Sequence, residues 1–315
     1  MPVTAIAADP RVKAHDPGPG HPEQPARYSA VINRLQSSGL LERLLPVETR
    51  IANDDELALA HARNYIELVG REVAQNRRQL STGDTGISAQ SDEAARFACG
   101  CVLSAIDAVF TQTATNAFCA VRPPGHHASA ARGMGFCLFN HVAIGARYAQ
   151  HKHGAQRIAI VDWDVHHGNG TQDIFYEDGS VLFCSTHQSP WYPGTGAARE
   201  RGEGKGEGLT VNCPFPAGSG QREIVGAFRE VFIPAMDQFK PDLILISAGF
   251  DSRAGDPLGQ FLLTDEDFRQ LTNLMTDVAA RHCKNRLVSV LEGGYSLEGL
   301  ASGTEAHVKR LLGGT

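Results

Sequence analysis

The chain has 315 residues, of which 42% are hydrophobic, and no linker or block of charge divides it, so we expect one domain over residues 1–315 with a large core. Its net charge of −6 and its lack of a basic run argue against nucleic acid as a direct partner. No apolar stretch is long enough to span a bilayer and the start lacks a signal-peptide pattern, so we expect a cytoplasmic protein without a membrane partner.

Short apolar runs alternate with helical patterns along the chain. Apolar residues follow helical spacing from Phe97 to Val109, and strands are predicted at residues 117–121, in a run ending at residue 161, and at residues 243–247 and 287–291. Thr264 resembles a helix N-cap before Phe268 and Leu271. This alternation predicts an α/β fold with a mostly parallel central sheet flanked by helices.

Each predicted strand leads into a polar or glycine-rich motif. The four motifs occupy residues 122–127, 162–170, 248–251 and 292–295. In open α/β sheets the ligand crevice lies outside the carboxyl ends of the strands. Folding should therefore bring all four motifs together in one active site.

The motif that follows residue 161 is the most informative part of the sequence. If strand alternation continues, Asp162, Asp164 and His166 converge on one side, while Trp163 and Val165 pack the other way. Carboxylates held so close together repel each other, and a divalent cation is the simplest compensation. The alternative is a solvated turn in which Asp and His side chains cap backbone groups, but the other strand-end motifs argue against it.

Residues from the other strand ends complete a candidate metal site. The plausible ligands are Asp164, His166 and Asp251, and the residues beside and opposite them are His126, His127 and Tyr295. Three protein ligands and an open position are typical of catalytic zinc, whereas structural zinc usually has four ligands. A site that retains a water molecule indicates a hydrolase.

Seven cysteines lie at positions 99, 101, 119, 137, 184, 213 and 283, without a Cys-x-x-Cys pair. An odd number of scattered cysteines favours buried free thiols over a disulfide framework or a zinc ribbon.

The chain resembles the histone deacetylase family in the broad sense that includes bacterial deacetylase-like amidohydrolases and acetylpolyamine amidohydrolases. The resemblance runs from His21-Pro22-Glu23 through RPPGHHA, GFCLFN, DWDVHHGNGT, PGTG and SAGFD to LEGGY, in family order. Asn169 and the segment GDPLG at residues 255–259 resemble the class II branch. The resemblance implies an arginase-like α/β fold with its active site at the carboxyl ends of the strands.

Carried onto this sequence, the resemblance makes Asp164, His166 and Asp251 the ligands of Zn²⁺, with Fe²⁺ as the alternative ion. It makes His127 the general base and His126 its partner, held by Asp162. Asn169 stands behind His127 where class I enzymes have an aspartate. Because a neutral amide raises an imidazole pKa less than a carboxylate does, His127 is expected to be neutral at working pH. Tyr295 is expected to donate a hydrogen bond to the developing oxyanion.

The resemblance also implies a narrow substrate tunnel. Phe136 and Tyr192 match its aromatic walls, while Gly135 and Gly294 would allow close approach of the acyl-lysine. Asp84 resembles a rim carboxylate that holds the substrate backbone, although a plain loop aspartate is the alternative. Arg27 resembles an arginine beneath the pocket, with a surface arginine as the alternative. A structural K⁺ site is implied at Asp162, Asp164, His166, Ser185 and Thr186.

Other polar residues have simpler interpretations. Surface or hydrogen-bonded side chains are expected for the remaining histidines considered, at positions 15, 21, 61, 151, 153, 187 and 282. The charged, glycine-rich residues 199–208 are expected to form a mobile solvated loop.

These patterns lead to one main functional hypothesis and three alternatives. The main hypothesis is zinc-dependent hydrolysis of acetyl-lysine in a protein or peptide to acetate and a free amine. Acetylated polyamines or other small acylated amines are the first alternative, although no additional N-terminal loop insertion typical of polyamine members is evident. A catalytically idle acyl-lysine binding module and a binuclear manganese hydrolase are ranked lower. The oligomeric state is left open.

Overall fold

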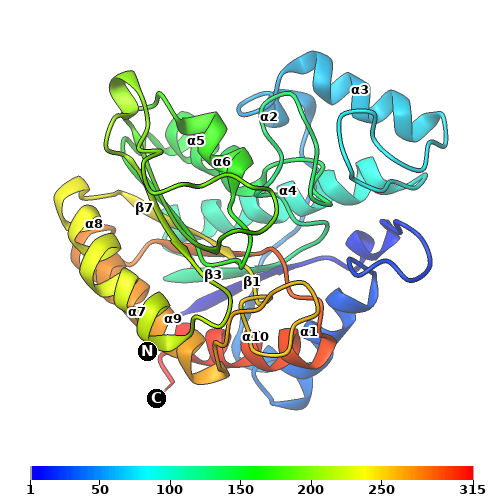
Figure 1. Ribbon diagram of the computed structural model, residues 1–315. Coiled ribbons are helices and arrows are strands. Elements are labelled where there is room, and N and C mark those ends of the chain that lie inside the picture. Colours follow the sequence, from blue (N-terminus) through cyan, green and yellow to red (C-terminus); the bar gives the residue numbers. More distant parts are fainter. Residues whose placement is uncertain (1, 315) are drawn as a thin grey trace.

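A single eight-stranded sheet runs through the computed structural model, which describes residues 2–314 (Figure 1). All the strand pairs are parallel, and the spatial order is β2-β1-β3-β8-β7-β4-β5-β6. The strands are β1 (Thr4–Ala8), β2 (Leu45–Pro46), β3 (Asn116–Ala120), β4 (Ile158–Asp162), β5 (Val181–Gln188), β6 (Thr210–Phe215), β7 (Leu243–Ala248) and β8 (Leu287–Leu291). The predicted mostly parallel α/β fold is therefore confirmed.

Helices cover both faces of this sheet (Figure 1). One layer contains α2 (Asp54–Leu57), α3 (Arg63–Ala74), α4 (Ser91–Phe110), α5 (His141–His153) and α6 (Asn169–Phe175). The other contains α1 (Ala26–Ser37), α7 (Gln221–Ala227), α8 (Ile233–Phe239), α9 (Asp265–His282) and α10 (Leu297–Leu311). A π-helical turn at Phe228–Phe232 joins α7 to α8, and short 3₁₀ turns lie at Pro10–Ala14, Leu41–Arg43 and Gly204–Gly206.

The four strands predicted from the sequence are the four central neighbours of the sheet, in the order β3-β8-β7-β4. Every residue of these strands is buried, as expected for apolar runs covered on both faces by helices. The predicted bounds of β8 are confirmed, while those of the other three shift by one residue at one or both ends. Since neighbouring parallel strands end at the same edge, their four polar motifs lie side by side.

The two predicted helices also form. The apolar repeat from Phe97 to Val109 lies within α4, whose buried face packs against β3 and α5. Thr264 is the N-cap of α9, and Asp267 completes the capping box by accepting hydrogen bonds from the backbone N–H and the hydroxyl of Thr264, both at 2.8 Å.

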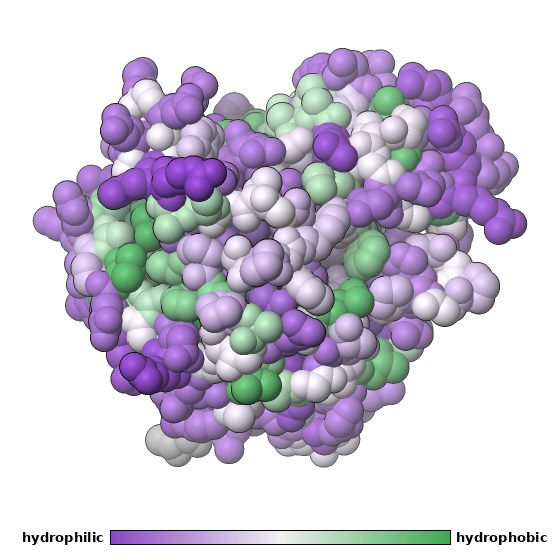
Figure 2. Space-filling model, in the orientation of Figure 1, coloured by the Kyte–Doolittle hydropathy of each residue, from purple (hydrophilic) through white to green (hydrophobic). Residues whose placement is uncertain are grey.

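Charged and polar residues cover most of the face shown in Figure 2, and apolar residues form only small patches on it. Across residues 2–314 the exposed large apolar side chains are Val3, Ile51, Trp191, Tyr192, Val231 and Leu262. None of the described helices is both long and apolar enough to cross a membrane. All seven cysteines are free thiols and six are buried, which confirms the prediction for them.

Candidate active site

The metal-site motif leaves its strand earlier than the alternation argument assumed. β4 ends at Asp162, and Asp164 and His166 lie in the turn that follows. The backbone N–H of Asp164 donates to Asp162 Oδ1 at 3.0 Å, and the N–H of His166 donates to Asp164 Oδ1 at 2.9 Å. The prediction that strand alternation aligns Asp162 with the other two is wrong, because the chain turns after Asp162, whose carboxylate faces His126.

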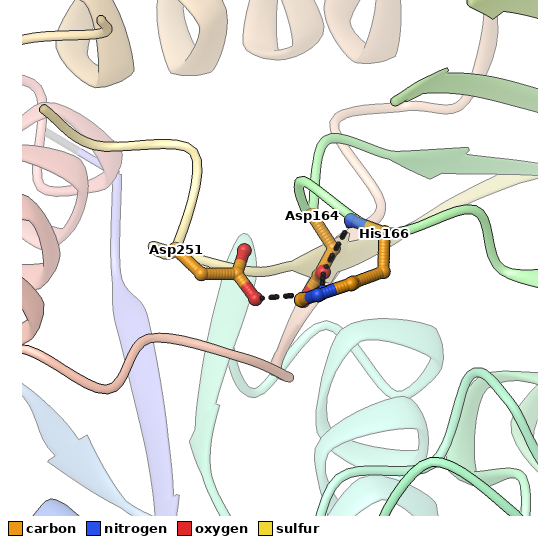
Figure 3. Close-up of side chains that lie close together, drawn as sticks. All are labelled: Asp164, His166 and Asp251. Carbon is orange, nitrogen blue, oxygen red and sulfur yellow. Dashed lines mark hydrogen bonds and ion pairs between the residues drawn. The ribbon is translucent and has the colours of Figure 1, made fainter. Parts of the chain in front are cut away.

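Asp164, His166 and Asp251 point toward one another at the ends of β4 and β7 (Figure 3). Their candidate ligand atoms all lie within 4.8 Å of one another, and all three residues are buried. His166 Nδ1 is 3.0 Å from Asp164 Oδ1 and 3.1 Å from Asp251 Oδ2. The three predicted ligands therefore converge on one point.

The electrostatics of this cluster are dominated by its two carboxylates. Burial and the neighbouring charge of Asp164 raise the pKa of Asp251 to about 7. Burial opposes a charge on His166, but hydrogen bonds to Asp164 and Asp251 raise its pKa to about 10. Such a cluster requires positive charge nearby, which a divalent cation supplies.

Two glycines lie so close to the carboxylates of the cluster that neither position could carry a side chain without a clash. A Cβ atom on Gly293 would lie 2.0 Å from Asp251 Oδ2, and one on Gly249 would lie 2.1 Å from Asp164 Oδ2. The N–H of Gly293 donates to Asp164 Oδ2 at 2.8 Å, which orients that carboxylate. Two oriented carboxylates, one imidazole and a side open to the pocket fit a divalent metal ion with a free coordination position.

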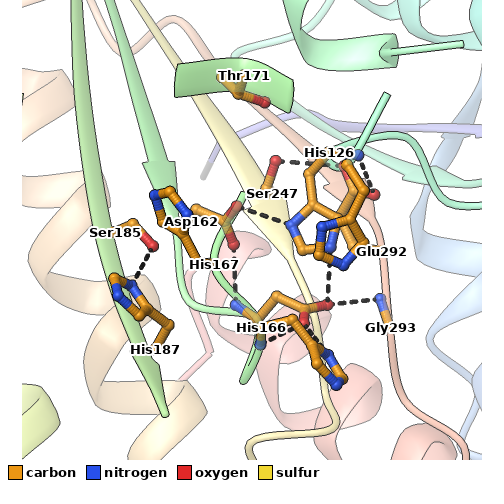
Figure 4. A network of polar contacts seen from close by, with 12 residues as sticks. His126, Asp162, His166, His167, Thr171, Ser185, His187, Ser247, Glu292 and Gly293 are labelled. Atoms are coloured by element: carbon orange, nitrogen blue, oxygen red, sulfur yellow. Dashed lines mark hydrogen bonds and ion pairs between the residues drawn. The ribbon is translucent and has the colours of Figure 1, made fainter. Parts of the chain in front are cut away.

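His126 lies inside a network of polar contacts shown in Figure 4. Its Nδ1 is 2.9 Å from Asp162 Oδ2, as the resemblance implied. Glu292 Oε2 accepts hydrogen bonds from the backbone N–H groups of Gly125 at 2.6 Å and of His126 at 3.1 Å. Burial opposes a charge on His126, but Asp162 and Asp164 raise its pKa well above its usual value, so this imidazole favours the protonated form.

His127 has the opposite electrostatic environment. Its Nδ1 lies 2.8 Å from Asn169 Oδ1, and an amide oxygen only accepts, so Nδ1 carries the proton and Nε2 is free to accept one. Burial and the positive charges of His126 and His166 hold the pKa of His127 well below its usual value. The predicted neutral imidazole at this position agrees with these contacts.

Tyr295 follows β8 and reaches the pocket opposite the histidines. Burial raises its pKa well above the usual value, so its hydroxyl stays protonated and able to donate. Arg27 lies beneath it, with Cζ 5.0 Å from the ring centroid. The guanidinium donates to the carbonyls of Gly294 at 2.7 Å and Glu292 at 2.5 Å. Arg27 is fully buried, so the surface alternative for it is wrong.

A pocket of about 240 Å³ leads to this cluster. Its lining residues are Asp84, His127, Gly135, Phe136, His166, Trp191, Tyr192, Leu258 and Tyr295. The aromatic walls predicted from the resemblance, Phe136 and Tyr192, are therefore both in place. The pocket joins the candidate metal ligands to the surface through mostly apolar walls.

Three of the predicted substrate-binding residues, Asp84, Gly135 and Gly294, have structural settings of their own. Asp84 accepts hydrogen bonds from the N–H of Gly135 at 2.7 Å and from the hydroxyl of Tyr192 at 3.0 Å, so it braces the pocket wall. Gly135 has φ +56°, and a Cβ there would lie 2.3 Å from the ring of His127, so the absence of a side chain makes room for that imidazole. Gly294 is not among the residues that line the pocket.

The residues of the predicted potassium site lie on the adjacent strands β4 and β5 and in the turn that follows β4. Asp162 and Ser185 are register partners on β4 and β5, and both are fully buried. Ser185 Oγ lies 3.0 Å from His187 Nδ1 (Figure 4), and Thr186 Oγ1 has no hydrogen-bond partner among the described residues. A K⁺ ion at this place remains a prediction.

Sequence reasoning missed several buried groups. His15, His61 and His187 are hydrogen-bonded, which is one of the two settings expected for them, but they are also buried, and the sequence carried no signal for the buried His141, His167 and His307. Glu200, in the loop expected to be solvated, accepts hydrogen bonds from the Gln172 side chain and the Gly196 N–H. Glu292 and Asp256 stand inside the motifs LEGGY and GDPLG. The signal for Glu292 was an acidic residue directly after a buried strand, whereas Asp256 lies in a loop eight residues beyond the end of β7.

Comparison with known proteins identifies the class of protein. The family model described as "Histone deacetylase domain" matches residues 21–311. The chain is 39% identical over 314 residues to a "Probable deacetylase" of Archaeoglobus fulgidus, a match that covers 99% of this chain and 87% of the relative. It is 41% identical over 306 residues to human "Polyamine deacetylase HDAC10", covering 92% of this chain but 44% of that protein.

The solved structure "Crystal Structure of HDA15 HD domain" superposes with a TM-score of 0.94 at 38% identity, covering 99% of this chain and 89% of that one. The chain belongs to the histone deacetylase family and has the arginase/deacetylase fold. It is a hydrolytic enzyme of the deacetylase kind, from a family that is generally metal-dependent.

Proposed function

We propose that this protein is a zinc-dependent deacetylase that hydrolyses acetyl-lysine in proteins or peptides to acetate and a free amine. The observation that carries the proposal is the convergence of Asp164, His166 and Asp251 next to a pocket. Of these three, His166 lines the pocket, together with His127 and Tyr295. Zn²⁺ bound by these three ligands would polarise the amide carbonyl and lower the pKa of a water molecule to about 7. Fe²⁺ is the alternative ion.

The protein's own residues divide the remaining work between them. His127, held neutral and oriented by Asn169, accepts the proton of the attacking water at Nε2. Tyr295 donates its hydroxyl hydrogen bond to the carbonyl oxygen as negative charge develops there. Asp162 holds His126 in its protonated form, next to His127. This positive charge favours release of the proton that His127 has accepted, so the histidine pair returns a proton to the leaving amine.

The pocket favours an acyl-lysine over an acetylated polyamine. Its walls are mostly apolar, which suits the aliphatic stem of a lysine side chain. Apart from the candidate metal ligands, its only lining carboxylate in residues 2–314 is Asp84, which already accepts two hydrogen bonds. A polyamine carries further ammonium groups, and no unengaged carboxylate lines the pocket to pair with them. The similarity to human polyamine deacetylase keeps acetylated polyamines as the second candidate.

The test is acetate release by the purified, zinc-reconstituted protein from an acetyl-lysine peptide and from acetylspermidine, measured side by side. We expect release that a hydroxamate chelator inhibits and that is faster on the peptide. Metal content should be one ion per chain, and comparing zinc with ferrous loading identifies the more active form.

Two variants serve as controls. Asp251→Ala should lose metal and activity together, since it removes a ligand. Tyr295→Phe should bind metal normally and lose turnover by roughly 10²–10³-fold, as seen when an oxyanion donor is removed. Faster turnover of acetylspermidine would instead support the polyamine function, and stable peptide binding without turnover in a metal-loaded sample would favour a binding module.

A further inference from the structure

Asp256 is a buried carboxylate that the mechanism above does not use. It is only 8% exposed, and it lies in the loop between β7 and α9, five residues beyond the candidate ligand Asp251. Its Oδ2 accepts hydrogen bonds from the backbone N–H groups of Tyr295 at 2.7 Å and Ser296 at 2.9 Å. Asp256 therefore fixes the backbone of the residue that carries the proposed oxyanion donor.

The other oxygen of the same carboxylate reaches the pocket wall. Asp256 Oδ1 accepts from the N–H of Leu258 at 2.9 Å, and Leu258 lines the pocket. The carbonyl of Leu258 in turn accepts from the indole N–H of Trp191 at 2.9 Å, at the pocket mouth. One short chain of contacts thus connects the mouth, the wall and Tyr295.

A carboxylate is the side chain best suited to this position. It only accepts, and its two oxygens meet three N–H donors, so every contact is favourable. An amide of the same shape would turn an N–H₂ group toward at least one of these donors, and a buried donor left without an acceptor costs stability at that contact.

A second side chain holds the backbone that precedes Tyr295. The guanidinium of Arg27 donates to the carbonyl of Gly294 at 2.7 Å, and Gly294 has φ +122°, a conformation that a glycine adopts readily. Arg27 acts on one side of Tyr295 and Asp256 on the other. Without Asp256 the Tyr295 hydroxyl would no longer be held at a fixed distance from the substrate carbonyl oxygen to which it donates.

We propose that Asp256 is a positioning residue for catalysis. By bonding the backbone of both Tyr295 and Leu258, it fixes the position of the Tyr295 hydroxyl relative to the pocket wall that Leu258 forms. This inference rests on the proposed function, because it acts through the Tyr295 oxyanion donor. It predicts that removing the Asp256 carboxylate lowers kcat while metal binding is retained, since the hydrogen bonds of this carboxylate go to the backbone of Leu258, Tyr295 and Ser296 and not to the three candidate ligands.

The experiment is a double-mutant cycle in the metal-loaded full chain, with Asp256→Asn, Tyr295→Phe and the double variant assayed on an acetyl-lysine peptide. We expect Asp256→Asn to lower kcat by roughly 10–100-fold, because small misplacements of a catalytic group have effects of that size. Metal affinity should stay unchanged. The double variant should be no slower than Tyr295→Phe alone, because a misplaced phenol costs nothing once its hydroxyl is gone.

Asp267→Asn is the matched control. Asp267 is also a buried aspartate with two hydrogen bonds to its neighbours, but it caps α9 and does not contact Tyr295. It should lower thermal stability and leave kcat unchanged. Asp256→Ser serves if the asparagine variant does not fold, since its smaller side chain leaves room for water to bond the three N–H groups.

Specific results would overturn the inference. Unchanged kcat in either Asp256 variant, losses that multiply in the double variant, or a weakened metal affinity would each show that Asp256 does not act through Tyr295. If Tyr295→Phe loses turnover while Asp256→Asn keeps the wild-type kcat, only this inference fails. If Tyr295→Phe keeps full turnover, the proposed role of Tyr295 fails and this inference fails with it.

Discussion

The floor and the mouth of the pocket are built by different means. At the floor, His126, Asp162, Asp164, Asp251 and Glu292 are at most 2% exposed and bond one another or the backbone. At the mouth, Trp191 and Tyr192 are 38% and 37% exposed, and each has one hydrogen bond from its side chain, to Leu258 and Asp84 respectively. The floor thus holds charged side chains away from solvent, while the mouth exposes aromatic side chains to it.

Because the floor is buried, neighbouring charges there have strong effects on the protonation of its two histidines, His126 and His127. Two adjacent imidazoles, with ring centroids 4.0 Å apart, have pKa shifts in opposite directions. His126 lies beside the carboxylates of Asp162 and Asp164, which favour its protonated form. His127 has an amide partner, and burial and its neighbouring imidazoles favour its neutral form. Changes at the floor should therefore have much larger effects than changes at the mouth.

The largest effect is expected for His127→Ala. This variant removes the proposed base, so kcat should fall by about 10²–10⁴-fold, the usual contribution of general acid–base catalysis. Metal content should stay at the wild-type level because His127 is not a candidate ligand. The measurement is steady-state turnover beside metal analysis. A metal-loaded variant with near-normal kcat would contradict the assigned base.

Beneath the floor, Glu23→Gln should cost about 3–5 kcal/mol of folding free energy, because it leaves buried arginines without their anion. Glu23 accepts from Arg122 at 2.8 and 2.6 Å and from Arg27 at 3.1 Å. Burial opposes its ionisation, but Arg122 and His15 hold its pKa well below the usual value.

The stability that Glu23 supplies is thus present above the pKa it has in the unfolded chain and is lost as pH falls through the lower folded value. Denaturant unfolding at neutral and acid pH measures both effects. The variant should be less stable at neutral pH and should lose less on acidification than the wild type. Equal stability at neutral pH would show that these buried charges are not coupled as described.

Asn169→Asp tests the contrast between the two imidazoles directly. A carboxylate at 2.8 Å from Nδ1 favours the imidazolium, so the pKa of His127 should rise, by about 1–3 units for a close opposite charge. Because only the neutral ring accepts a proton, the acid limb of kcat/KM should move to higher pH. The pH profile of both proteins gives the result, and an unmoved acid limb would mean that Asn169 does not control the base.

The smallest effects are expected at the mouth. Tyr192→Phe removes one exposed hydrogen bond to Asp84, worth about 0.5–1.5 kcal/mol. KM for an acetyl-lysine peptide should rise by about 2–10-fold with kcat unchanged, since the floor is untouched. A fall in kcat as large as that of a floor variant would show that mouth and floor are not independent.

Much of the site was predictable because its residues directly follow the strands that carry them. β3, β4, β7 and β8 are fully buried and mostly apolar runs, and each leads into its motif within two residues of its end. Asp164, His166 and Asp251 could be named as ligands from residue type and the strand-end rule, and the structure brings them together. The caps of α9 were likewise readable, since Thr264 and Asp267 are three residues apart.

The parts that could not be predicted depend on partners far apart in the chain. Glu292 bonds the backbone of His126 across 166 positions, and Arg27 bonds the Glu292 carbonyl across 265. Whether His15 is exposed or packed against Glu23 and Ser91 likewise depends on which helix covers it. No local pattern encodes such contacts, because burial is a property of the assembled layers.

The sequence by itself therefore determined the four central strand runs, the N-cap of α9 and the chemical types that gather at one edge of the sheet. Only the tertiary structure decided that β3, β8, β7 and β4 are neighbours, that Asp162 turns to His126, and that Asp256 supports Tyr295. The physical reason is that hydrophobic periodicity acts over a few residues, whereas strand order and the pairing of buried charges are settled by packing the whole chain at once.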